Sequence, residues 1–454
     1  MNASQQWNQQ KLDLPTETQR NPDRSSEAFV ASRLSQSPAG KVRLMESILE
    51  RENMNRAYRQ VVSNKGAPGV DGMSVGQLRG YLDRHWPKIK ESLLDGSFEP
   101  MPARRKEMEK PDGGVRLLGI PTVLDRLIQQ ALAQVLGKLW DHSFSESSFG
   151  FRPGRSQREA IELCRSHLAS GLRYCVDIDL SKFFDRVNHD RLMHRLSAKI
   201  EDKRVLKLIR KYLQSGVMIE GVHVDTGEGT PQGGPLSPLL SNIVLDELDK
   251  ELEKRALKFV RYADDCVIYV GSRRAGERVM RSMTAFITRR LRLKVNEDKS
   301  SVGRPWSSKY LGFSLTNSRT CPRIRIHWKT LRKLKDKVKE LTKRTRGRSL
   351  RQIIAELVEY LRGWWGYFRT AESLSKLCGL ENWIRRRLRS LVWKQWKNRR
   401  TRVRKLHARG ISKEAALKTG CSRKGAWRMS QVKWVMIALP NQYFDSHGLV
   451  IPWT

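Results

Sequence analysis

The 454-residue sequence is poor in features that define several common protein classes. Its six cysteines are scattered and include no Cys-x-x-Cys pair, so neither a disulfide framework nor a structural zinc site is expected. No apolar run approaches the roughly 20 residues that span a bilayer, and the N-terminus lacks the basic start and apolar stretch of a signal peptide. These absences predict a reduced, cytoplasmic protein with no membrane partner.

Acidic residues are scarce relative to basic ones. The chain has 87 Lys and Arg against 47 Asp and Glu, which gives a net charge of +40 and a pI of about 10.4. Such an excess predicts an extended polyanionic partner, and the 13 interleaved Trp offer rings on which bases can stack. A solvated basic surface or a membrane-surface protein is the alternative. Nucleic acid is the favoured partner, which places the protein at the nucleoid.

The first half of the chain changes character twice. Residues 1–40 are polar and predict a disordered extension. Residues 41–99 carry helical periodicity, with helices expected over 42–60 and 78–95. Residues 100–320 mix strands and helices. We expect strands at Tyr174–Leu180, Val217–Val224, Phe259–Arg261, Val267–Val270 and Tyr310–Leu315, and helices at 122–140, 157–170, 190–213, 237–253 and 275–292.

The last third is strongly basic, and its pattern up to residue 410 is helical. Residues 325–410 form one such module, and its part from 331 to 410 has 25 Lys and Arg against six Asp and Glu. Residues 411–454 form a smaller basic tail. A basic helical module after a mixed domain predicts a nucleic-acid clamp, while a helical bundle with a solvated basic face and Trp in its core is the plainer interpretation. Both descriptions can hold for different faces.

Two adjacent aspartates, Asp264 and Asp265, lie between two runs rich in aromatic and β-branched residues, Phe259–Tyr262 and Cys266–Val270. This layout predicts a strand, a tight turn and a strand. Two carboxylates this close repel each other, and a chain tolerates them best with a cation between them. Tyr-x-Asp-Asp in this setting resembles the active-site hairpin of reverse transcriptases.

A further acidic pair lies upstream in Tyr-Cys-Val-Asp-Ile-Asp-Leu-Ser-Lys-Phe-Phe-Asp. Asp177 and Asp179 alternate with apolar residues, so both face the same side of a strand. Spacing along the strand leaves open which of the two binds metal. A third metal-binding carboxylate is expected from this neighbouring strand.

Two other motifs fit a nucleotide. Thr-Pro-Gln-Gly-Gly-Pro at 230–235 precedes a helix, and its glycines allow close backbone approach, so Gln232 is expected to touch the incoming nucleotide. Arg104, Lys110 and Arg116 flank a Pro-Asp-Gly-Gly hairpin turn, where cations suit a triphosphate. Solvated charges on a hairpin are the alternative.

Three more cations complete the candidate site. Arg152 and Arg155, in Gly-Phe-Arg-Pro-Gly-Arg, are candidates to grip template phosphates. Lys299, in Val-Asn-Glu-Asp-Lys-Ser, is a candidate proton donor to the leaving pyrophosphate. The alternative for Lys299 is an ion pair with its acidic neighbours.

In order along 42–315, these motifs resemble the reverse transcriptases encoded by bacterial group II introns. The specific marks are Leu-Gly-Ile-Pro-Thr, Gly-Phe-Arg-Pro-Gly-Arg, Thr-Pro-Gln-Gly-Gly-Pro-Leu-Ser-Pro and Arg-Tyr-Ala-Asp-Asp. Gly-Trp-Trp-Gly-Tyr-Phe at 363–368 and Trp-Ile-Arg-Arg-Arg-Leu at 383–388 resemble that family's thumb, or maturase, domain. The chain is most similar to the class C proteins, which lack a nuclease module.

The resemblance implies an α+β right hand, with an antiparallel palm sheet in the fingers–palm, a helical thumb and a small C-terminal DNA-binding region. It implies Asp179, Asp264 and Asp265 as ligands of two Mg²⁺ ions. Asp179 is selected because the family has an aromatic five residues after this ligand, which makes Phe184 the gate against a ribose 2′-hydroxyl. The implied partners are intron RNA, an RNA template with a DNA or RNA primer, target DNA and dNTPs.

Two other functions compete with an intron-encoded enzyme. A non-catalytic splicing factor would keep the fold without the chemistry, but an idle acidic cluster destabilises a protein that binds no metal. A free-standing relative recruited to DNA repair or phage defence would keep the chemistry without an intron. The DNA flanking the gene separates this last possibility from the first.

Overall fold

The computed structural model describes residues 43–109, 115–219, 222–224, 229, 233–372 and 375–453. The chain divides into two compact units, residues 1–44 and 45–454, and the elements named below belong to the second unit apart from the first residue of α2. Their mixture of helices and strands confirms the predicted α+β class. The predicted extension at 1–40 lies outside the described residues.

The first helices are α2 (Leu44–Ile48), α3 (Arg51–Ser63) and α4 (Leu78–Asp95). The single helix predicted over 42–60 is wrong, because Glu50 has an extended backbone with ψ of 137° and separates α2 from α3. The prediction for 78–95 is confirmed, and α4 ends where Gly96 takes a left-handed conformation with φ of 77°.

A four-stranded sheet has the order β2-β1-β4-β5. Its strands are β1 (Ala103–Glu109), β2 (Val115–Ile120), β4 (Val217–Ile219) and β5 (Val222–Val224). β1 pairs antiparallel with β2 and parallel with β4, whereas β4 and β5 are antiparallel. The strand predicted over 217–224 is therefore two short strands of a hairpin.

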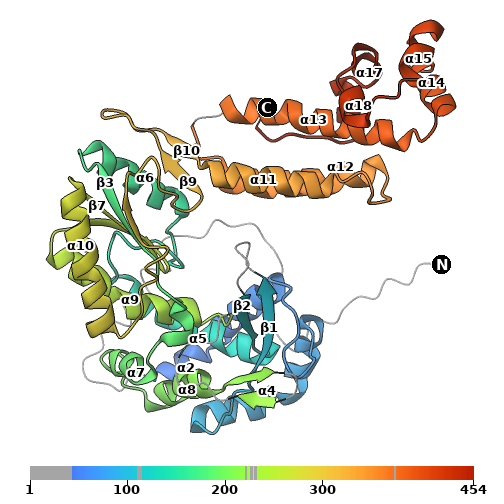
Figure 1. Cartoon of the computed structure of the whole chain (residues 1–454). Coiled ribbons are helices and arrows are strands. Elements are labelled where there is room, and N and C mark those ends of the chain that lie inside the picture. Colours follow the sequence, from blue (N-terminus) through green and yellow to red (C-terminus); the bar gives the residue numbers. More distant parts are fainter. Residues whose placement is uncertain are drawn as a thin grey trace, which may run out of the picture. The chain divides into compact units, whose positions relative to one another are not determined.

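A second four-stranded sheet has the order β6-β7-β3-β8 (Figure 1), from β3 (Tyr174–Ile178), β6 (Lys258–Tyr262), β7 (Asp265–Val270) and β8 (Ser301–Gly303). Every neighbouring pair is antiparallel, which confirms the predicted antiparallel palm sheet. Helices α6 (Gln157–Ala169), α9 (Ser237–Lys254) and α10 (Arg273–Phe286) pack against its strands. The short π-helical segment η3 (Ile287–Leu291) extends α10.

Helices α5 (Val123–Asp141), α7 (His189–Ser197) and α8 (Lys203–Gln214) pack against other helices: α5 against α3 and α9, α7 against α8 and α9, and α8 against α4. The single helix predicted over 190–213 is wrong, because the chain breaks between α7 and α8. Asp202 has an extended backbone there, and its carboxylate accepts a hydrogen bond from the Arg204 N–H as the N-cap of α8.

After the palm, β9 (Phe313–Leu315) and β10 (Ile324–Ile326) form a two-stranded antiparallel sheet. The strand predicted to start at Tyr310 starts later, because Leu311 and Gly312 have positive φ values of 49° and 85° and make a tight turn. The remaining elements are helices. The helical prediction up to residue 410 is confirmed by α11 (Trp328–Leu341), α12 (Leu350–Phe368), α13 (Ser375–Gln395) and α14 (Arg399–His407), and four shorter helices follow: α15 (Lys413–Gly420), α16 (Ala426–Met429), α17 (Lys433–Ala438) and α18 (Asn441–Asp445).

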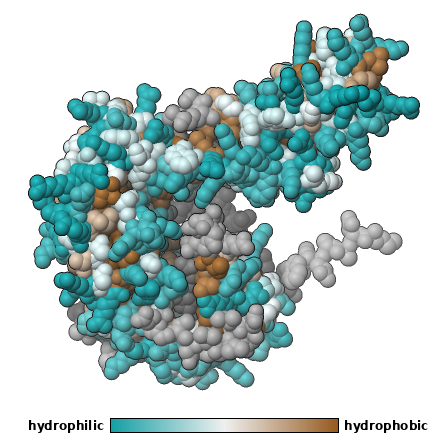
Figure 2. All heavy atoms as spheres, viewed as in Figure 1, coloured by the Kyte–Doolittle hydropathy of each residue, from teal (hydrophilic) through white to brown (hydrophobic). Residues whose placement is uncertain are grey.

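One hydrophobic core connects the palm sheet with the C-terminal helices. Val267 of the palm, Phe313 of β9, Leu334 of α11 and Trp393 of α13 belong to the same buried cluster. Hydrophilic side chains cover most of the visible surface of the C-terminal helices (Figure 2). Among the described residues, no helix is long and apolar enough to cross a membrane.

Replacement of Trp393 tests the core of the C-terminal helices. The Trp393 side chain is 1% exposed, so Trp393→Ala should lower the free energy of unfolding by about 3–5 kcal/mol. Trp328→Ala is the matched control, because Trp328 is 56% exposed and its loss should change stability by less than about 0.5 kcal/mol. Thermal denaturation followed by circular dichroism measures both. Equal losses for the two variants would contradict this description of the core.

Candidate active site

The acidic turn lies at the end of the β6–β7 hairpin. Tyr262 pairs directly with Asp265, so Ala263 and Asp264 form a two-residue turn. Ala263 has a φ of 57°, and a positive φ at the first of two turn residues is the pattern of a type II′ turn, in which glycine is usual. A non-glycine residue in such a conformation costs about 1–3 kcal/mol and persists only where its surroundings hold it.

The upstream aspartates lie on the neighbouring strand. β3 pairs with β7, and Asp177 lies opposite Val267, so Asp177 on β3 and Asp179 just after its last residue are next to the end of the hairpin. Asp177, Asp179 and Asp265 line one cavity of about 710 Å³ together with Lys299. The structure thus brings together two of the three predicted metal ligands, the predicted proton donor and Asp177. Asp264 is half-buried in the adjoining turn.

The carboxylates of the cavity interact strongly. Burial raises the pKa of Asp177 to about 7, with further contributions from the negative charges of Asp265 and Asp179. Burial also raises the pKa of Asp265 to about 6, followed by the effects of Asp264 and Asp179. The Asp265 side chain is exposed and lines the cavity. Since both shifts arise from unfavourable negative charge, a cation bound here would relieve them.

Asp179 is fixed by the segment that leads to β8. The Asn296 side-chain amide donates a hydrogen bond of 3.0 Å to the Asp179 carboxylate, and the Asn296 N–H donates to the Asp179 carbonyl at 2.8 Å. The Asp179 N–H donates to Ser300 Oγ at 3.0 Å. Asn296 and Ser300 flank Lys299, and sequence reasoning missed both. Their only signal was a polar cluster around that lysine.

The candidate ribose gate lies just after Asp179. Phe184 belongs to the 3₁₀ helix η2 (Phe183–Arg186) and is half-buried. Its ring packs edge-to-face on Phe183, with ring centroids 5.2 Å apart. Phe183 is buried, so it supports Phe184 from the protein side.

The candidate nucleotide-binding residues are only partly described. Lys110 and Gln232 lie outside the described residues, and only the backbone of Arg116 is described, in β2. Arg104 is half-buried in β1, opposite Ile120. The backbone near Gln232 lies close to β2, because a Cβ on Gly233 would meet the Gly119 carbonyl at 2.5 Å and Gly233 has a φ of 130°. A glycine is therefore required where these two segments meet.

The two candidate template-binding arginines differ from each other. The Arg152 side chain is 3% exposed and donates to the carboxylate and carbonyl of Asp141 and to the carbonyls of Ser145 and Ser148. The predicted phosphate contact of Arg152 is therefore wrong, because internal contacts occupy its guanidinium. Arg155 is more exposed and forms an ion pair with Glu146 at the surface. A template contact for Arg155 stays a prediction.

The opposite wall of the cavity comes from the thumb helices. Lys333 of α11, Tyr360 of α12 and Lys309 line it. The remaining lining residues continue along the same two helices and the preceding turn: Tyr310, Leu311, Gly312, Thr330, Leu334, Trp364, Tyr367 and Phe368. Carboxylates therefore face a wall of lysines and aromatic rings, which suits a phosphate backbone with bases that stack. Sequence reasoning missed Lys309 and Lys333, which are two of 87 basic residues.

Two family models match the chain. Residues 108–315 match "Reverse transcriptase (RNA-dependent DNA polymerase)", and residues 331–410 match "Group II intron, maturase-specific domain". The first match contains the palm sheet and the acidic residues of the cavity, and the second contains most of α11 and all of α12 to α14. Residues of both matched segments line the cavity.

Curated relatives agree with these models. "Protein YkfC" of Escherichia coli (strain K12) is 33% identical over 57% of this chain and 79% of its own length. "Group II intron-encoded protein LtrA" of Lactococcus lactis subsp. cremoris is 37% identical over 48% of this chain, but the match spans only 36% of LtrA. A solved structure, "Partial Cas6-RT-Cas1--Cas2 complex", is similar over 54% of this chain and 42% of its own, at a TM-score of 0.34 and 23% identity.

The acidic hairpin and the facing basic helices thus lie in the regions that match the two models, and a relative is matched over most of its length. The chain belongs to the group II intron family of reverse transcriptases and maturases, whose catalytic part is an RNA-directed DNA polymerase.

Proposed function

We propose that the acidic cavity is the polymerase active site and that Asp179, Asp264 and Asp265 hold two Mg²⁺ ions there. The observation that carries the proposal is the convergence of carboxylates from β7 and from the C-terminal part of β3 and the residue after it in one cavity, where the pKa values of Asp177 and Asp265 are raised. Strained backbone in the turn between the strands adds support, since such strain gathers at functional sites.

The donor set fits Mg²⁺. All the candidate ligands are carboxylate oxygens, which this hard cation prefers. Among the described residues, no group of three or more His, Cys, Asp or Glu side chains forms a ready-made metal site. This agrees with Mg²⁺, which keeps several waters and is held by one or two carboxylates together with substrate phosphates. When bound, the ions would lower the pKa of the primer hydroxyl and stabilise the leaving pyrophosphate.

The protein's own residues would orient the reactants. In the reaction, the primer 3′-oxygen forms a bond to the α-phosphorus, the bond to the pyrophosphate breaks, and the hydroxyl proton is lost. Lys299 lies in the same cavity as the aspartates and would protonate the pyrophosphate. The cations Arg104, Lys110 and Arg116 would bind the triphosphate, Gln232 would contact the nucleotide, and Phe184 would exclude a ribose.

The thumb helices would bind RNA. Their lysines and aromatic rings line the cavity, and the segment from 331 to 410 carries 25 Lys and Arg. We propose that this module binds group II intron RNA and assists its splicing, and that the polymerase copies the intron into DNA from a primer at the target site. The names of the matched maturase model and of LtrA support the choice of RNA.

Magnesium should stabilise the protein through the aspartates. In EDTA their repulsion is unrelieved, so Asp265→Asn should raise the melting temperature by roughly 2–4 °C, the shift expected from about 1 kcal/mol. Mg²⁺ should then raise the melting temperature of the wild type more than that of the variant. Asp190→Asn is the control, since Asp190 is an exposed residue paired with Arg210 on α8. An equal response of all three proteins to Mg²⁺ would argue against the metal site.

Primer extension on an RNA template tests the catalytic assignment. Asp264→Asn should lower the rate with dNTPs and Mg²⁺ by more than about a hundredfold, because several kcal/mol of transition-state stabilisation is lost. Asp190→Asn should extend like the wild type. Near-normal extension by Asp264→Asn, or no extension by a folded wild type that binds RNA, would refute the assignment.

Phe184 should set the choice of sugar. Phe184→Ala removes the ring that would meet a 2′-hydroxyl, so the preference for dNTPs over rNTPs should fall by roughly 10–200-fold, the range for discrimination by one pocket contact. Competing dNTP and rNTP incorporation measures the ratio of kcat/KM values. The rate with dNTPs serves as the internal control, and an unchanged ratio would exclude Phe184 as the gate.

A further inference from the structure

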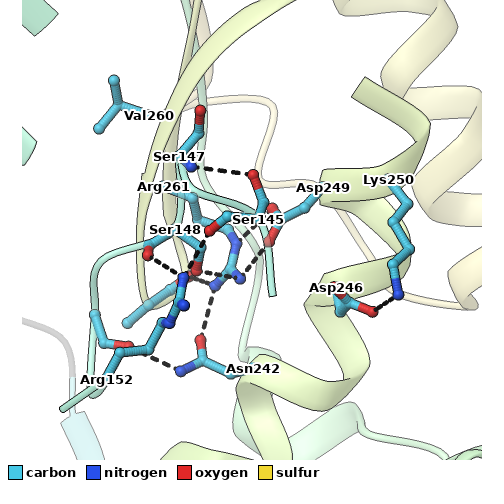
Figure 3. Close-up of polar contacts among 12 residues, drawn as sticks. Ser145, Ser147, Ser148, Arg152, Asn242, Asp246, Asp249, Lys250, Val260 and Arg261 are labelled. Atoms are coloured by element: carbon cyan, nitrogen blue, oxygen red, sulfur yellow. Dashed lines mark hydrogen bonds and ion pairs between the residues drawn. The ribbon is translucent and has the colours of Figure 1, made fainter. Parts of the chain in front are cut away.

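A fully buried arginine, Arg261, lies two residues before the Ala263–Asp264 turn. Arg261, on β6, has 0% of its side chain exposed, and so does its ion-pair partner Asp249 on α9. The functional assignments above do not involve either residue. Figure 3 shows the Arg261 guanidinium enclosed by Asp249, Asn242 and Ser148.

All three guanidinium nitrogens of Arg261 donate hydrogen bonds. Nε and Nη2 donate to the two carboxylate oxygens of Asp249 at 2.7 and 2.5 Å. Nη2 also donates to Ser148 Oγ at 2.7 Å, and Nη1 donates to Asn242 Oδ1 at 2.9 Å. A second bond from Nη1, also of 2.9 Å, goes to the carbonyl of Ala263. The last contact reaches the strained residue of the acidic turn.

The same turn is held from its other side by the loop before α6. The Arg261 N–H donates to the Ser147 carbonyl, and the Phe149 N–H donates to the Arg261 carbonyl, each at 2.9 Å. A Cβ on Gly150 would lie 2.2 Å from the Ala263 nitrogen, so this backbone presses directly on the turn. Asn242 ties the two sides together, because its amide donates to the Gly150 carbonyl at 2.8 Å.

Helix α9 connects this network with the nucleotide side of the site. Asn242 and Asp249 are seven residues apart, which places them on the same face of α9. The helix begins at Ser237, directly after the Gly-Gly-Pro segment whose Gly233 lies against Gly119 of β2. One rigid helix therefore carries both the anchor of Arg261 and the end of the proposed nucleotide-binding loop.

Stability alone does not account for this ion pair. Burying two charges costs several kcal/mol per ion, and apolar side chains of similar volume often serve equally well. An arginine fork fixes geometry more tightly than apolar packing does, because its donors have set directions. Arg261 contacts α9 through Asp249 and Asn242. It contacts the turn through the Ala263 carbonyl. Only an arginine at this position would make both contacts.

We propose that Arg261 is a positioning residue, which holds the Ala263–Asp264 turn so that the adjacent carboxylates keep a metal-binding geometry. The inference rests on the proposed role of Asp264 and Asp265. Arg261 touches neither substrate nor metal in this scheme; it acts through the turn and is itself held by Asp249 and Asn242.

Arg261→Lys is the direct test, because it keeps the buried charge but loses the fork. We expect the Mg²⁺ concentration for half-maximal primer extension to rise and kcat to fall, together by about 10–100-fold, the usual cost of losing a residue that orients a metal ligand. Binding of the RNA template, measured by fluorescence anisotropy, should stay at the wild-type level. The concentration of active enzyme is measured by active-site titration, and kcat is calculated per active molecule. Partial unfolding of the variant is then not mistaken for lost activity.

Gly150→Ala is the second variant, and it disturbs the turn without touching the ion pair. Its Cβ must displace the Ala263 backbone, so the same rise in half-saturating Mg²⁺ is expected. Arg204→Lys is the matched control, because Arg204 pairs with Asp202 and Glu46 on elements outside the palm sheet. It should keep the wild-type Mg²⁺ dependence even if its melting temperature falls.

The outcomes separate this inference from the proposed function. If Arg261→Lys or Gly150→Ala melts at a lower temperature but keeps the wild-type kcat and Mg²⁺ dependence per active molecule, Arg261 is only structural and the inference is overturned. If Arg261→Lys does not fold, the result for Gly150→Ala decides. Undiminished extension by Asp264→Asn would instead overturn the proposed function, and this inference with it.

Discussion

Mutual repulsion of carboxylates is the constraint on which the rest of the palm depends. Asp177 and Asp265 lie on adjacent antiparallel strands, and burial, followed by the negative charges of neighbouring aspartates, raises the pKa of both. A flexible hairpin would relieve that repulsion by moving the strands apart. The palm prevents this with buried packing below the strands, with a hydrogen bond from the Asn296 amide to the Asp179 carboxylate, and with one from the Asp179 N–H to Ser300 Oγ. When the backbone keeps carboxylates close together despite their repulsion, binding of a cation between them stabilises the protein.

The basic thumb and the acidic palm solve one electrostatic problem together. A polymerase must hold a polyanion next to its own carboxylates, and water alone does not screen charges at such short range. Lys309 and Lys333 line the same cavity as Asp177 and Asp265, so positive charge lies beside the acidic cluster. The buried cluster that includes Val267 of the palm and Trp393 of α13 joins the palm to the C-terminal helices. It therefore holds the two sides of the cavity in place. The net charge of +40 thus has local consequences as well as long-range attraction of nucleic acid.

The local patterns in the sequence predicted the palm hairpin well because alternation and turn chemistry act over a few residues. The pairing of Tyr262 with Asp265 and the antiparallel sheet follow from them. Long-range contacts were less accessible. The break between α7 and α8 depends on Asp202, whose carboxylate caps α8 and also accepts a hydrogen bond from the Met45 N–H far along the chain. Periodicity continued across that break and gave no sign of it, and spacing alone did not separate Asp177 from Asp179.

Arginine was the hardest residue to interpret, for a physical reason. In a chain with so many basic residues, a phosphate contact is the first interpretation of any arginine. Arg152 and Arg261 are nevertheless both buried in the protein interior. A buried guanidinium needs acceptors for all its donors, and here serine and aspartate carbonyls, Asn242 and Asp249 supply them. The side-chain acceptors of Arg261 come from α9 and from a loop over a hundred residues upstream, so only the fold reveals them, whereas those of Arg152 lie within 11 residues of it. Arg152 and Arg261 therefore bind acceptors of the protein itself, and Arg261 also bonds to the Ala263 carbonyl in the acidic turn.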